Sequence, residues 1–148
     1  MKPKRILAAV DFSKNSDKAL ATAAEQAAAF GAELVLFHVA EIGSAGYEFG
    51  DADFGTMEER IRQKAGELLE QAVRPLAARG LHVRAEVKSG WPFGGQRPHQ
   101  EIIEAAKRLE ADLIVLPTHA RTGFEHVLLG STTERVVRHA PCAVLVVR

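Results

Sequence analysis

The feature that most constrains the fold is a regular alternation of short apolar runs with amphipathic segments along 148 residues. Apolar runs of this length are typical of strands buried on both faces of a parallel sheet. We predict five strands, at residues 5–10, 33–40, 81–88, 112–116 and 143–147. The third run alternates only weakly between apolar and polar residues, which favours a place nearer an edge of the sheet.

Helical periodicity fills the first two intervals between these strands. Ser16 can cap the first predicted helix, and Gly31 lies just past its end. The second is a long amphipathic helix over residues 57–76, and it is preceded by an aperiodic, glycine-rich loop. Pro75 lies inside its pattern, so we expect a kink or a broken last turn.

The second half of the chain repeats the pattern with shorter helices. Residues 89–98 are rich in glycine and proline, which predicts an irregular loop. A third helix is predicted over 101–109. Ser131 and Glu134 have the spacing of a capping box, which predicts the start of a fourth helix.

Strands that alternate with helices predict an α/β fold. The expected architecture is an open, doubly wound, five-stranded parallel sheet with about four helices on its two faces, built as a single domain over residues 1–148. Sheets of this kind bind ligands outside the carboxyl ends of their strands, where the strand order reverses. Candidate site residues are therefore expected at that rim.

Composition narrows the range of partners. Lysine plus arginine and aspartate plus glutamate both number 19. The basic excess that nucleic acid binding requires is missing, so we expect no nucleic acid partner. No apolar run approaches the roughly 20 residues of a membrane span, and none fits the core of a signal peptide. We expect a cytoplasmic protein that does not associate with membranes.

The C-terminal third of the chain carries the most specific motifs. Residues 116–123 read Leu-Pro-Thr-His-Ala-Arg-Thr-Gly, residues 129–135 read Leu-Gly-Ser-Thr-Thr-Glu-Arg, and residues 139–142 read His-Ala-Pro-Cys. Together they resemble the C-terminal signature of the universal stress protein family. That signature is a phosphate loop, written G-x2-G-x9-G-[ST], between a buried strand and the start of a helix.

The resemblance covers almost the whole chain and implies a nucleotide site. In family members that bind ATP, an aspartate after the first strand contacts the ribose, backbone near the end of the second strand reads the adenine, and the glycine loop holds the phosphates. By position, these roles fall on Asp11, on Val39, and on Gly130 with its two following residues. The candidate binding residues are Asp11, Val39, Leu116, Pro117, His119, Ala120, Arg121, Gly130, Ser131 and Thr132.

Two positions of the loop depart from the family pattern. Pro117 and Ala120 stand where the signature has its first two glycines. Proline has no N–H to donate, and the alanine methyl group hinders a close approach of the backbone. We therefore expect a weakened or altered phosphate site, for which AMP is as plausible a ligand as ATP, with Mg²⁺ as a further candidate cofactor.

Structural roles compete with the binding roles for two of the candidates. Ser131 would cap its helix with or without a ligand, and Asp11 could simply close the turn after the first strand. His38, which lies inside a strand, fits a structural role better than a ligand-binding one.

Three functions remain open at this point. The first is a regulatory stress-response module that binds an adenine nucleotide and forms a homodimer through the apolar edge strand at 143–147, with a regulatory protein as a further partner. The second is a stress protein that binds no nucleotide and acts through protein contacts alone. The third is a weak ATPase, although the sequence contains no G-x-S-x-G nucleophile elbow, no Walker lysine after a glycine loop and no Cys/His metal spacing.

Overall fold

The computed structural model describes residues 1–41, 50–90, 97–118 and 129–148. Over these residues the chain forms five strands and four helices. In chain order they are β1 (Arg5–Ala9), α1 (Lys14–Phe30), β2 (Glu33–Glu41), α2 (Gly50–Ala78), β3 (Val83–Gly90), α3 (Pro98–Arg108), β4 (Leu113–Pro117), α4 (Ser131–His139) and β5 (Ala143–Val147). No helix in this part of the chain is both long and apolar enough to cross a membrane.

The strands form one parallel sheet in the order β3-β2-β1-β4-β5. β1 lies at the centre between β2 and β4, so the strand order reverses there. β3 and β5 occupy the two edges. The open, doubly wound parallel sheet expected from the sequence is confirmed, and so is the edge position of the third strand.

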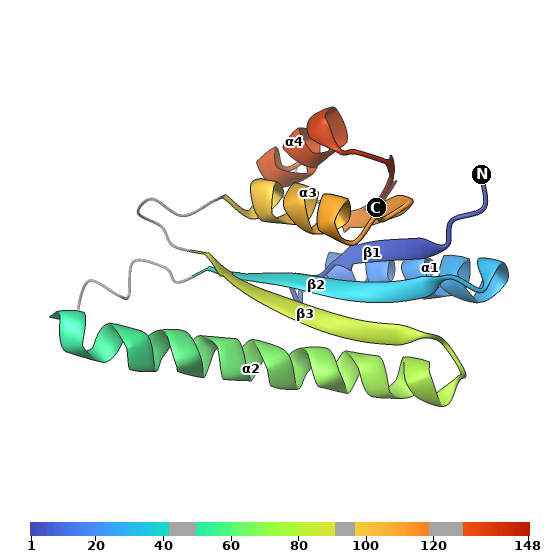
Figure 1. Cartoon of the computed structure of the whole chain (residues 1–148). Coiled ribbons are helices and arrows are strands. Elements are labelled where there is room, and N and C mark those ends of the chain that lie inside the picture. The colour runs from blue at the N-terminus through green and yellow to red at the C-terminus, as the bar shows by residue number, and fades with distance from the viewer. Residues whose placement is uncertain (42–49, 91–96, 119–128) are drawn as a thin grey trace.

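Two helices cover each face of the sheet (Figure 1). Neighbouring residues of a strand point to opposite faces, and they divide the core accordingly. Ile6 and Leu36 pack in the cluster beside α1 and α2. Leu7 and Val35 pack in the cluster beside α3 and α4. The four side chains are almost completely buried, as expected for strands covered on both faces.

Helix boundaries differ from the predictions in three places. α2 begins at Gly50, inside the segment expected to be a loop, and continues through Pro75 to Ala78. Proline removes its own N–H donor but leaves those of the residues that follow it, so the last turn is not broken. α3 begins at Pro98, earlier than predicted, because proline suits the first helical position.

Both predicted serine caps were wrong. The N-cap of α1 is Ser13, whose side chain accepts a hydrogen bond from the Ser16 N–H. The Ser16 hydroxyl oxygen instead accepts one from the Asp11 N–H at 3.0 Å. The N-cap of α4 is Gly130, so Ser131 is the first helical residue and forms no capping box.

A chain of ion pairs crosses the amino-terminal half of the sheet on the side of α3. The Glu33 carboxylate accepts from Arg5 Nε at 2.5 Å and from Arg84 Nε at 2.7 Å. Arg84 also pairs with Glu86, whose second oxygen accepts from Arg108 Nη2 at 2.5 Å. These five side chains connect β1, β2, β3 and α3.

The ion-pair chain predicts a loss of stability in acid. The hydrogen bond from Arg84 lowers the pKa of Glu33, and that from Arg108 lowers the pKa of Glu86. Depressed carboxyl pKa values contribute stability that is present above the unfolded-state pKa of about 4.3 and lost as pH falls through the folded-state values. We expect Arg84→Gln to lower the free energy of unfolding by about 1 kcal/mol at pH 7, an effect limited by solvent screening.

The measurement is urea unfolding at a series of pH values. The difference between wild type and Arg84→Gln should shrink as the pH is lowered below about 4.3. Arg74→Gln is the matched control, because Arg74 pairs with Glu70 on α2 with both side chains largely exposed. A difference for Arg84→Gln that stays constant with pH would show that the arginine acts through packing alone.

Candidate functional site

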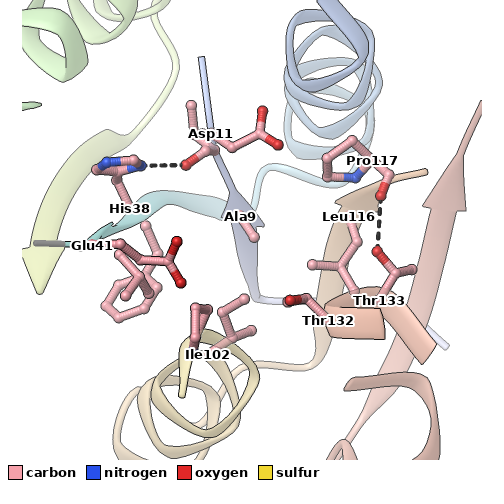
Figure 2. A pocket seen from close by; sticks show the side chains of 13 residues that line it. Ala9, Asp11, His38, Glu41, Ile102, Leu116, Pro117, Thr132 and Thr133 are labelled. Carbon is pink, nitrogen blue, oxygen red and sulfur yellow. Dashed lines mark hydrogen bonds between the residues drawn. The ribbon is translucent and has the colours of Figure 1, made fainter. Parts of the chain in front are cut away.

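A cavity of about 260 Å³ lies at the carboxyl ends of the central strands, on the side of α3 and α4 (Figure 2). Its position is the one that the reversal of strand order predicts for a ligand site. The cavity is lined by Ala9, Val10, Asp11, Phe37, His38, Val39, Glu41, Pro98, Ile102, Leu116, Pro117, Thr132 and Thr133. Residues from β1, β2, β4, α3 and α4 therefore meet around one space.

Asp11 lies at the turn that follows β1. Its Oδ1 accepts hydrogen bonds from the Ser13 N–H at 3.0 Å and from the Ser13 hydroxyl at 2.5 Å. Phe12 has a positive φ of 61°, which is uncommon for a residue other than glycine, and its ring packs on that of His38 at a centroid distance of 4.5 Å. These contacts fix the turn. Asp11 thus has the structural role proposed as its alternative, and it also lines the cavity.

Backbone groups at the end of β2 face the cavity. The Val10 N–H donates to the Phe37 carbonyl at 2.9 Å, so the peptide groups of Phe37 face β1. Peptide groups alternate in direction along a strand, and those of Val39 consequently face the same side, where β1 has already ended. His38 Nδ1 lies 2.6 Å from the Val10 carbonyl oxygen, which confirms a structural contact for that histidine. Val39 can therefore present a donor and an acceptor to a ligand.

The end of β4 is held by three hydrogen bonds from different elements. The Thr118 N–H donates to the Val147 carbonyl at 2.8 Å, and Asn15 Nδ2 donates to the Thr118 carbonyl at 2.9 Å. The Thr133 hydroxyl donates to the Pro117 carbonyl at 3.0 Å (Figure 2). Hydrogen bonds therefore hold the backbone of Pro117 and Thr118, at the edge of the cavity, to α1, α4 and β5.

The missing N–H of Pro117 does not weaken the sheet. Thr118 donates toward β5, so the preceding residue faces the β1 side of β4. The pairing of β1 with β4 ends at Ala8 and Val115, and Pro117 lies two residues beyond this end. Proline therefore removes a donor only from the part of β4 that borders the cavity.

The start of α4 supplies backbone donors beside the cavity. The first hydrogen bond of this helix runs from the Glu134 N–H to the Gly130 carbonyl at 2.9 Å. The N–H groups of the three preceding residues have no acceptor within the helix, and the positive end of the helix dipole lies there. Two of these residues, Thr132 and Thr133, line the cavity. Gly130 has a φ of −57°, which any residue can adopt, so it contributes the absence of a side chain rather than an unusual conformation.

The family model that describes the universal stress proteins matches residues 2–148. The chain belongs to the universal stress protein family. A universal stress protein of Methanocaldococcus jannaschii is 31% identical over 145 residues, which cover 98% of this chain and 82% of that protein. The universal stress protein UspA from Lactobacillus plantarum has the same fold, with a TM-score of 0.78 and 27% identity over 100% of this chain and 99% of the other.

Two further universal stress protein structures share the fold and contain nucleotides. One is a complex with cAMP, with a TM-score of 0.71, 22% identity and coverage of 100% of this chain and 99% of that one. The other, from Archaeoglobus fulgidus, is a complex with dAMP, with a TM-score of 0.67, 23% identity and full coverage of both chains. At these identities the two structures show that this chain shares their fold, and nothing about its ligands.

The residues predicted from the universal stress protein signature fall into three groups. Asp11, Val39, Leu116, Pro117 and Thr132 line the cavity. Gly130 and Ser131 lie next to it at the start of α4 but outside its lining. His119, Ala120 and Arg121 lie outside the described residues.

Sequence reasoning missed the part of the cavity that α3 and the last residue of β2 provide. Glu41 follows Phe37 and Val39 at a spacing of two, so strand periodicity places all three on one face. Pro98 and Ile102 are one helical turn apart, so they lie on the same face of α3. The prediction started this helix at residue 101 and therefore left Pro98 outside it. Within the described ranges, no three His, Cys, Asp or Glu side chains come together as metal ligands.

Proposed function

We propose that this universal stress protein binds an adenine nucleotide in the cavity at the carboxyl ends of β1, β2 and β4 and acts as a regulatory stress-response module. The observation that carries the proposal is that one cavity joins the backbone of Val39 to the amino-terminal end of α4. The first can read a base and the second can hold a phosphate. The cAMP and dAMP complexes of the two structural relatives support the same ligand class.

The base would lie between apolar walls. Ala9, Ile102 and Leu116 contribute aliphatic surface to the cavity from β1, α3 and β4. A purine ring buries apolar area against such walls, which favours binding. The N–H and carbonyl of Val39 offer one donor and one acceptor, and these complement the acceptor N1 and the donor 6-amino group on one edge of adenine.

The phosphate would lie at the start of α4. Backbone N–H groups and the helix dipole bind an anion there without a charged side chain, and Thr132 adds a hydroxyl group. Pro117 offers no N–H from the opposite side of the cavity. We therefore propose that the first phosphate contributes most of the phosphate affinity, and that AMP binds about as tightly as ATP.

Titration calorimetry with AMP, ADP and ATP tests this proposal. We expect binding with dissociation constants below about 1 mM, and an affinity for ATP within about threefold of that for AMP. UMP serves as the control, because a pyrimidine cannot fill the base region in the same way. An absence of binding heat with all three adenine nucleotides at about 1 mM would leave only the function through protein contacts.

The glycine positions of the loop offer a second measurement on the same proposal. Replacing Pro117 and Ala120 by glycine together restores the family pattern. We expect this variant to gain affinity for ATP while its affinity for AMP stays unchanged, because only the outer phosphates need the first half of the loop. An unchanged ATP affinity would contradict the role assigned to these two positions.

We also propose that the protein forms a homodimer through β5. The strand lies at the edge of the sheet, and its residues from Val144 to Val147 are only partly buried. An apolar edge strand with unpaired backbone groups invites pairing with a second copy. The dimer would place two cavities in one assembly, and a regulatory partner protein could then contact both.

A further inference from the structure

Glu41 places an exposed carboxylate at the edge of the proposed nucleotide site. It is the last residue of β2, opposite Gly90 of β3. Phe37, Val39 and Glu41 alternate along the strand and all line the cavity. In Figure 2 the Glu41 carboxylate and the Thr132 hydroxyl project toward the same space from opposite sides.

The chemistry of this position is that of an acceptor. An ionised carboxylate accepts hydrogen bonds and donates none. Within the part of the chain that the structure describes, the Glu41 carboxylate makes no hydrogen bond or ion pair, whereas the Asp11 carboxylate is held by Ser13. A donor or a cation is therefore the favoured ligand group beside Glu41, and an anionic phosphate is disfavoured at that end of the cavity.

The two ends of the cavity thus differ in what they accept. The amino-terminal end of α4, with Thr132, favours negative charge. The β2 end, with Glu41, favours hydrogen-bond donors. A nucleotide satisfies both conditions when its phosphate lies toward α4 and a hydrogen-bond donor, such as an amino group of its base, lies toward β2.

We propose that Glu41 determines base specificity by accepting a hydrogen bond from the exocyclic amino group of adenine, a role that rests on the proposed nucleotide function. The amino group has two hydrogens, so the Val39 carbonyl would accept the one on the N1 side and Glu41 the one on the N7 side. Hypoxanthine carries a carbonyl oxygen at the same position, which a carboxylate repels. The site therefore selects 6-aminopurines over 6-oxopurines.

A thermodynamic cycle isolates the contact between the amino group and the carboxylate. AMP and purine riboside 5′-monophosphate differ only in the 6-amino group, and both are titrated into wild type and Glu41→Ala. We expect loss of the amino group to weaken binding to wild type about tenfold more than it weakens binding to Glu41→Ala, in which the Val39 carbonyl is the remaining acceptor for the amino group. Glu25→Ala is the control, because it removes the same charge from an exposed position on α1 and should show the same loss as wild type.

A conservative variant supplies an independent readout. Glu41→Gln keeps the shape of the side chain but can also donate a hydrogen bond. We expect it to bind IMP more tightly than wild type does, because the amide can donate to the 6-oxo group. Thermal unfolding of each variant checks that the exposed substitution leaves the fold intact.

The outcomes distinguish a failure of the specificity role of Glu41 from a failure of the proposed nucleotide binding. If Glu41→Ala strengthens or weakens AMP and the riboside monophosphate by the same factor, Glu41 acts only as a charge and the proposed specificity role is wrong, although nucleotide binding stands. The same holds if IMP gains nothing in Glu41→Gln. A wild type that binds no AMP overturns the nucleotide function itself.

Discussion

Thr132→Asp is expected to weaken AMP binding at least about tenfold while leaving the free energy of unfolding unchanged or slightly higher. A carboxylate at the second position of α4 interacts favourably with the helix dipole, which is worth about 0.3–1 kcal/mol. The same carboxylate occupies the cavity where the phosphate would lie. Two like charges about 4 Å apart repel by roughly 4 kcal/mol near a protein surface, which exceeds the tenfold threshold of 1.4 kcal/mol. Few substitutions should separate folding from binding so clearly.

Calorimetric titration and urea unfolding measure the two effects on the same sample. Thr132→Ser keeps the hydroxyl group and should bind AMP within about threefold of wild type. Adenosine, which has no phosphate, should bind Thr132→Asp and wild type almost equally. If AMP binding survives in Thr132→Asp, the phosphate does not lie at the start of α4.

Val146→Pro is expected to convert the proposed dimer into a monomer. The Thr118 N–H donates to the Val147 carbonyl, so the peptide groups of Val147 face β4 and those of Val146 face outward from the sheet. Proline at 146 removes a donor from the free edge and none from the pairing with β4. A twofold-symmetric interface contains the site twice, and each unpaired buried group costs about 1–3 kcal/mol, so the dissociation constant should rise at least about tenfold.

Light scattering coupled to size-exclusion chromatography distinguishes the two masses at a concentration where wild type is dimeric. Val146→Ala is the matched control, because it shortens the side chain but keeps the outward N–H. We expect it to remain a dimer if backbone pairing dominates the interface. A wild type that elutes as a monomer, or a Val146→Pro variant that stays dimeric, would remove β5 from the interface.

The sheet could be predicted because its strands are buried on both faces. Such strands read as continuous apolar runs, and segments like Leu34–Leu36 and Leu113–Leu116 stand out without knowledge of their neighbours. Helix starts were harder. The Ser-x-x-Glu pattern at Ser131 satisfies the capping rule, yet Gly130 occupies the N-cap. Glycine is also accepted at the N-cap and serine at the first helical position, so the pattern alone does not decide between the two residues.

The candidate site could be predicted only where it follows the ends of strands. Asp11, Val39 and Pro117 each lie at or just after a strand that the sequence marks, and the topology brings them together. Ile102 reaches the cavity through the packing of α3, which is a tertiary contact that no local pattern encodes. Glu41 was hidden for another reason, since it is the first residue of the stretch that was predicted to be a loop.

Pro117 illustrates how a sheet can leave part of a candidate binding site free to vary in sequence. The neighbouring Thr118 must carry an N–H, because it donates to the Val147 carbonyl. The backbone of Pro117 faces the side of β1, beyond the point where the pairing of β1 with β4 ends. The sheet therefore requires no N–H at position 117. The fold therefore requires a backbone donor at Thr118 but not at Pro117. Glycine and proline are therefore interchangeable at this position with little cost to the stability of the fold, and in the proposed nucleotide site the exchange would change which phosphates are held.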